Sequence, residues 1–231
     1  MLKLMQLELK KFHLAGYIRS ALIANACILG LLCIIALDSQ STGIPEFTQY
    51  TQLLDLMDML VRATFIVFAS VLLCRFIVGE FKSKSITILF MYPIHRQKLM
   101  IAKLLVVLLF TFLSIIISEI IITAAIHLLN HFVLIVPDNL TLSILGQQSA
   151  RTLINAVAAS FMGLVPLYMG MRRYSVPTTI VTSILIVALL FSNNNGATLS
   201  SIAPVQIGFS ILGMLVAYAA IRRIEYKDIT S

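Results

Sequence analysis

The sequence contains six long apolar runs, and their length limits the possible folds more than any other feature. They occupy residues 18–37, 59–79, 99–129, 152–171, 178–192 and 202–221. A helix needs roughly 20 apolar residues to cross the hydrocarbon of a bilayer, and most of the runs reach that length. Only 12% of the residues are charged, and the mean hydropathy is +0.98, which excludes an ordinary soluble domain. We therefore expect an all-α integral membrane protein whose residues 1–231 form a single transmembrane domain.

The fifth run is the weakest of the six, because polar residues 193–195 follow it directly, and five spans is the competing count. The distribution of Lys and Arg favours six. Fifteen of the 17 basic residues lie in the N-terminal segment, the second and fourth connections and the C-terminal tail. Basic connections remain on the cytoplasmic side. We expect a multi-pass protein of the cell membrane with both termini in the cytoplasm, and the net charge of +7 therefore does not indicate nucleic-acid binding.

The N-terminal residues predict a helix that lies on the membrane surface. Leu2, Met5, Leu9 and Phe12 fall on one helical face, and Lys3, Gln6 and Lys10 fall on another. A helix with one apolar and one basic face binds at the headgroup boundary. We expect that this segment is not cleaved off as a signal peptide and that it forms an amphipathic interfacial helix before the first span.

The chain has no GxxxxGK[ST] loop, so it is not expected to hydrolyse ATP alone. Energy for transport would come from a partner subunit or from an ion gradient, and the latter normally needs ionisable groups inside the spans. Glu119 is the clearest candidate, about 30 Å from the cytoplasmic end of its helix at 1.5 Å per residue. Either its carboxylate lines a transport pathway inside the helix bundle, or it is an interfacial residue that pairs with Arg151 or reaches external water.

Two further patterns have both a functional and a structural interpretation. His127 and His131 share a helical face, but two imidazoles do not complete a metal site, and Glu119 lies about 80° away around the helix. We expect no metal or cofactor bound by this chain and no catalytic residue. Small residues at four-residue spacing in the fourth span predict close helix packing, inside one bundle or in a dimer. They are Ala156 with Ser160 and Ala159 with Gly163.

The second connection, "EFKSKSITILFMYPIHRQKL" at residues 80–99, is unusual because it carries an apolar cluster between basic residues. The cluster consists of Ile86, Ile88, Leu89, Phe90, Met91 and Tyr92. Pro93 would end a helix directly after it. An exposed apolar cluster of this size is covered by lipid headgroups, by the protein's own helices or by another protein. A short amphipathic helix that enters a groove on a cytoplasmic partner is the favoured interpretation, and an interfacial helix with basic anchors is the alternative.

This connection, together with the span count and orientation, resembles permease subunits of the ABC-2 class of ATP-binding-cassette transporters, including those for export of, or immunity to, antimicrobial peptides. Glu80, Ile88 to Met91, Pro93, Arg96 and Lys103 follow the order of the family's pattern, while Lys84-Ser85 stands where Gly-Thr is usual. The resemblance implies that residues 80–92 form a coupling helix on a separate ATPase. The implied coupling interface is Glu80, Lys84, Ile88, Leu89, Phe90, Met91, Tyr92, Pro93 and Arg96.

By this resemblance the chain is a non-catalytic permease that pairs with a second permease subunit, identical or different, and with ABC ATPase subunits that use ATP. The short external connections favour export or extraction from the bilayer over import. The expected cargo is hydrophobic or amphipathic, with a peptide favoured. Two other functions stay open: a non-transporting anchor or sensor subunit that recruits a cytoplasmic partner, and, less favoured, an intramembrane metal-dependent hydrolase.

Overall fold

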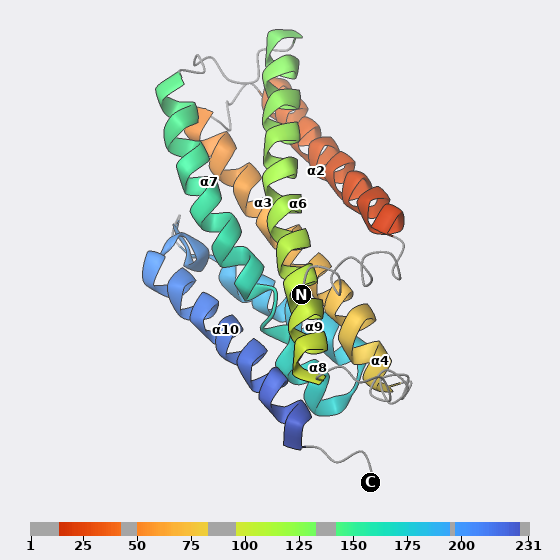
Figure 1. The fold of residues 1–231 in the computed structure, drawn as a ribbon. Helices are drawn as coiled ribbons and strands as arrows, with labels where there is room; N and C mark the ends of the chain where they lie inside the picture. Colours follow the sequence, from red (N-terminus) through yellow and green to blue (C-terminus); the bar gives the residue numbers. More distant parts are fainter. Residues whose placement is uncertain (1–13, 43–49, 83–95, 133–141, 195–196, 227–231) are drawn as a thin grey trace. The chain divides into compact units, whose positions relative to one another are not determined.

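The computed structural model describes residues 14–42, 50–82, 96–132, 142–194 and 197–226, and they are almost entirely helical (Figure 1). The long helices are α2 (Leu14–Thr42), α3 (Tyr50–Leu73), α6 (Arg96–Phe132), α7 (Leu142–Met162) and α10 (Ala203–Tyr226). The shorter helices are the π-helix η1 (Cys74–Val78), α4 (Gly79–Lys82), α8 (Pro166–Arg173), α9 (Val176–Leu190) and the 3-10 helix η2 (Leu199–Ser201). Two-residue strands β1 (Asn193–Asn194) and β2 (Ala197–Thr198) pair antiparallel between α9 and α10. Helices suit apolar surroundings because they satisfy their own backbone hydrogen bonds.

Five segments in the described part of the chain are long and apolar enough to cross a membrane: Gly16–Ile35, Tyr50–Lys82, Gln97–Leu129, Gly146–Arg173 and Pro204–Arg222. They correspond to five of the six predicted spans. The remaining predicted span, residues 178–192, corresponds to α9, which has 15 residues. At 1.5 Å per residue α9 is about 22 Å long, less than the roughly 30 Å of hydrocarbon. The sixth crossing therefore stays a prediction.

The start of α3 corrects the predicted boundaries of the first connection. The second apolar run begins at residue 59, which leaves Asp55 and Asp58 in the preceding connection, but α3 begins at Tyr50 and includes both. The helix Tyr50–Lys82 still contains a stretch apolar enough for a span, and the same helix carries the two carboxylates. Asp58 is consequently a charged residue of a candidate membrane helix rather than of a loop.

Pro166 follows a short break between two helices. α7 ends at Met162, residues 163–165 form a turn, and Pro166 begins α8. Within the turn, the backbone N–H groups of Leu164 and Val165 donate to the carbonyls of Phe161 and Met162, at 3.0 Å each. Proline fits the first position of a helix because its missing N–H would have no intrahelical acceptor there.

The chain divides into two compact units, each built from segments that are distant in sequence. One unit holds Ala15–Thr64 and Leu113–Ala156, and the other holds the described residues of Phe65–Phe112 and Val157–Ser231. In the second of these, α8 and α9 pack against each other and both contact η1. The hydroxyl oxygens of Ser70 and Ser183 lie 2.9 Å apart and join α3 to α9. The predicted single domain over residues 1–231 stays a prediction.

Candidate functional site

Glu119 is a buried carboxylate in the long apolar helix α6. The residue is 6% exposed, and its Oε1 atom has no hydrogen-bond partner among the residues that the structure describes. The pairing with Arg151 that the sequence left open is not present, since Arg151 is exposed and Glu119 makes no ion pair within the described residues. An ionisable side chain inside a membrane helix is expensive unless it has a partner or a function. Glu119 is therefore the starting point for a candidate site.

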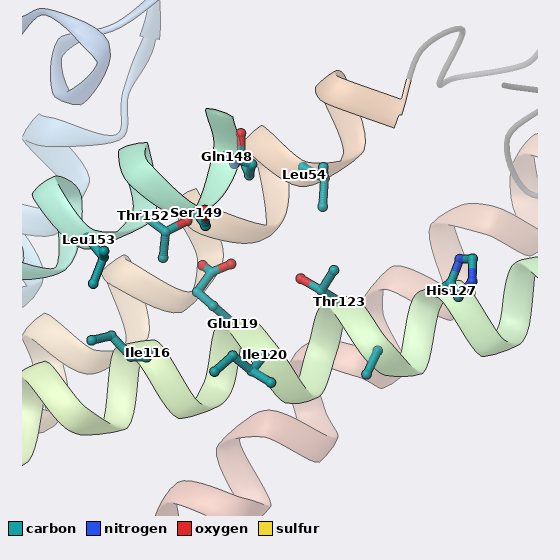
Figure 2. A pocket seen from close by; sticks show the side chains of 11 residues that line it. Leu54, Ile116, Glu119, Ile120, Thr123, His127, Gln148, Ser149, Thr152 and Leu153 are labelled. Carbon is teal, nitrogen blue, oxygen red and sulfur yellow. The ribbon is translucent and has the colours of Figure 1, made fainter. Parts of the chain in front are cut away.

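A cavity of about 570 Å³ lies beside Glu119, within the unit formed by Ala15–Thr64 and Leu113–Ala156. Its polar lining residues are Glu119, Thr123, His127, Gln148, Ser149 and Thr152. Its apolar lining residues are Leu54, Ile116, Ile120, Ala124 and Leu153. Figure 2 shows the Glu119 carboxylate directed from α6 towards Ser149 and Thr152 of α7, with Leu54 contributed by α3. The cavity thus has one acidic group, several neutral polar groups and aliphatic walls.

A second buried charge cluster lies in the same unit, and the sequence interpretation missed it. Arg62 Nη2 lies 2.6 Å from Asp58 Oδ2, and Asn155 Nδ2 donates to the same oxygen at 2.8 Å. Asp58 and Arg62 are four residues apart on α3, a spacing that places two side chains on one helical face. This spacing, in a helix otherwise apolar, was the signal available in the sequence. It was overlooked because Asp58 was assigned to a connection.

The other unit contains a buried ion pair at the two ends of the predicted coupling segment. Lys103 Nζ lies 3.0 Å from Glu80 Oε2, and the two side chains are only 1% and 9% exposed. Glu80 belongs to α4, directly before the connection, and Lys103 belongs to α6, directly after it. The pair therefore ties together the helices that enter and leave the connection. Phe81 directly follows Glu80 in α4, and the centre of its ring lies 6.0 Å from that of Tyr174. The turn between α8 and α9 therefore contacts α4.

Most of the predicted coupling interface lies outside the described residues. Lys84, Ile88, Leu89, Phe90, Met91, Tyr92 and Pro93 fall in residues 83–95. Arg96 is the first residue of α6. Glu80 is the predicted interface residue whose contacts the structure describes. The predicted amphipathic segment at the N-terminus likewise falls mainly on residues 1–13, which the structure does not describe.

The remaining candidates lie on α6 and α7. His127 lines the cavity near Glu119, while the side chain of His131 is outside the described part of the chain, as are its contacts. Within the described residues, no three His, Cys, Asp or Glu side chains are grouped as metal ligands. Ala156, Ala159 and Ser160 are buried. An added Cβ on Gly163 would lie 2.8 Å from Ala69 Cβ of α3, so this glycine allows close packing inside one chain. A role of these small residues in a dimer stays a prediction.

Comparisons with known proteins agree with the membrane architecture. The family described as "ABC-2 family transporter protein" matches residues 4–190 of the chain. The chain is also 37% identical over 227 residues to the uncharacterized protein YcbO of Bacillus subtilis (strain 168), covering 98% of this chain and all of that protein. No solved structure matches it significantly.

Proposed function

We propose that this chain, which belongs to the ABC-2 transporter family, is a permease subunit that exports a hydrophobic or amphipathic molecule, with a peptide as the favoured cargo. The observation that carries the proposal is the family match over residues 4–190 on a chain with five candidate membrane spans. A separate ATPase subunit supplies the energy, because the sequence has no phosphate-binding loop of its own. A second permease subunit, identical or different, completes the route.

The Glu80–Lys103 ion pair supports a coupling role for the connection between α4 and α6. A partner that pushes on residues 83–95 acts on a segment whose flanking helices are joined at 3.0 Å through two buried charges. Breaking a buried ion pair costs about 3 to 5 kcal/mol, so the two helix ends respond together rather than separately. The ring contact between Phe81 and Tyr174 extends this linkage to the turn between α8 and α9. Movement of the connection would thus reach α4, α6 and the turn between α8 and α9.

Replacement of Leu89 and Phe90 by Ser tests the coupling interface. If the ATPase buries both side chains, each substitution removes about 1.5 to 3 kcal/mol of apolar contact, and together they weaken subunit binding by roughly a hundredfold or more. The double variant should insert normally but lose the co-expressed ABC ATPase subunit, or lose the dependence of ATP hydrolysis on cargo. The measurements are co-purification in detergent and ATPase activity of the purified complex.

The double replacement of Ile44 and Phe47 by Ser is the matched control. It removes two apolar side chains from residues 43–49, which the charge pattern places on the opposite, external side. This control should keep both the ATPase and its coupling. Full binding and full coupling in the Leu89 and Phe90 variant would contradict the assignment. A wild-type complex whose ATP hydrolysis responds to no cargo would favour the anchor or sensor function instead.

A further inference from the structure

The cavity beside Glu119 has a carboxylate among its lining residues but no Lys or Arg side chain. Asp58, the other buried carboxylate of this unit, accepts from both Arg62 and Asn155. Glu119 is also buried and lines the cavity (Figure 2), and its Oε1 atom has no hydrogen-bond partner in the described ranges. Asp58 Oδ1 has no hydrogen-bond partner there either, but the Asp58 carboxylate has a cation on its other oxygen, whereas Glu119 makes no ion pair among the described residues. A buried carboxylate is normally held by a cation or by hydrogen-bond donors. The difference between the two carboxylates points to a group that enters from outside.

The nearby guanidinium of Arg62 is already engaged by another carboxylate. Arg62 Nη2 lies 2.6 Å from Asp58 Oδ2, whereas Glu119 makes no ion pair among the residues that the structure describes. His127 is the other ionisable residue that lines the cavity, but it is eight residues further along α6, about 12 Å at 1.5 Å per residue. It therefore does not neutralise the Glu119 end.

The size and walls of the cavity select an organic cation. A volume of about 570 Å³ is in the range of sites for small organic ligands. An inorganic cation takes several oxygen ligands at short distance, whereas Ile116, Ile120 and Leu153 offer hydrocarbon surface next to the carboxylate. A molecule with one basic group and an apolar body matches both features at once.

We propose that this cavity binds a singly charged amphipathic cation, with its ammonium or guanidinium group on Glu119 and its apolar body against the aliphatic walls. The inference rests on the proposed export function and deepens it, because it names the chemical class of the cargo and one residue that recognises it. Since the site lies within one chain, binding does not require the ATPase.

A pair of fluorescent probes tests the proposal on the purified full-length chain. N-dansyl-1,8-diaminooctane carries one ammonium on an apolar body, and its N-acetyl derivative has the same body without the charge. Fluorescence titration in phosphatidylglycerol nanodiscs should show at least about tenfold tighter binding of the charged probe, because its ammonium forms a charge-assisted hydrogen bond to a buried carboxylate. Glu119→Gln should reduce this ratio to about one.

Two controls separate loss of the site from loss of the fold. Asp55→Asn removes a carboxylate from an exposed position of α3 in the same unit and should leave the ratio unchanged. Ala124→Phe fills the exposed side of the cavity and should weaken both probes, while Ile117→Phe, on an exposed part of α6 that does not line the cavity, should weaken neither. Equal binding of the two probes to the wild type, or an unchanged ratio in Glu119→Gln, overturns the proposal.

A lipid amine has the same chemistry as an amphipathic cargo, so the membrane composition must be varied. Nanodiscs with added phosphatidylethanolamine should give the same affinity for the charged probe if the site serves a free cation. Competition by phosphatidylethanolamine would overturn the assignment to cargo and give the site to a membrane lipid. Both results are independent of ATP hydrolysis. Failure of the probe experiment with intact ATPase coupling would therefore reject the cargo class and leave the export function standing.

Discussion

The buried charges of this chain differ in how they are satisfied, and the difference separates structural residues from functional ones. Asp58 with Arg62, and Glu80 with Lys103, each form an ion pair within one compact unit. The Glu80–Lys103 pair joins α4 to α6, and the hydrogen bond from Asn155 joins the Asp58–Arg62 pair of α3 to α7, at the cost of desolvating the charges. Glu119 has no comparable partner in the described part of the chain. In the proposal above, the lone carboxylate next to the cavity is the binding group, whereas the paired carboxylates contribute to helix packing.

The Glu80–Lys103 pair should stabilise the fold in a way that depends on both partners. Lys103→Met removes the cation and leaves the Glu80 carboxylate buried, so we expect a loss of about 3 to 5 kcal/mol. Adding Glu80→Leu to Lys103→Met should recover much of that loss, because the remaining charge is removed. The measurement is the midpoint of thermal unfolding in detergent, followed by size-exclusion chromatography.

Lys98→Met is the matched control for this experiment, since Lys98 is an exposed lysine on the same helix. It should leave the midpoint almost unchanged, because exposed charges contribute little. If the single change Lys103→Met and the double change have equal midpoints, the carboxylate is not held by the lysine. The coupling argument would then lose its physical basis.

At the scale of helices, the sequence predicted the presence of the long helices much better than it predicted the residues at which they begin and end. Apolar length is a local property, and it identified the five long spans directly. The beginning of α3 was missed because Asp55 and Asp58 look like loop residues until the pairing of Asp58 with Arg62 and Asn155 is known. Glu119 could be identified from sequence as a lone carboxylate in an apolar helix. Its cavity could not, because the walls come from α3, α6 and α7 and depend on tertiary packing.

The contact between α10 and the end of α7 requires a glycine. A Cβ added to Gly213 would collide with the carbonyl group of Phe161, and backbone atoms cannot move aside as a flexible side chain can. Gly213→Ala should therefore destabilise the protein by about 1 to 3 kcal/mol, the usual cost of overpacking. Gly208→Ala, on the same helix with nothing within 4 Å of its added Cβ, is the control and should be neutral or slightly stabilising. Equal thermal midpoints for the two variants would contradict this helix contact.

For the whole molecule, the decisive question is whether α9 crosses the membrane. A helix of 15 residues is shorter than the hydrocarbon, but local thinning of the bilayer can accommodate such a difference at modest cost. Without this crossing, α10 would place the C-terminal residues, including Arg222, Arg223 and Lys227, on the external side. That arrangement conflicts with the tendency of basic residues to remain in the cytoplasm. The charge pattern therefore favours a short but complete crossing.

Reporter fusions should place Asn194 outside the cell and Ser231 in the cytoplasm. Alkaline phosphatase fused after Asn194 should be active and a fluorescent protein fused there should be dark, while fusions after Ser231 should behave in the opposite way. A fusion after Arg173, at the end of α8, is the reference and should be cytoplasmic. A cytoplasmic Asn194 with an external Ser231 would mean that α9 turns back without crossing. In that case the basic C-terminal tail would lie on the external side, and it could not share the cytoplasmic face of the protein with the predicted coupling segment.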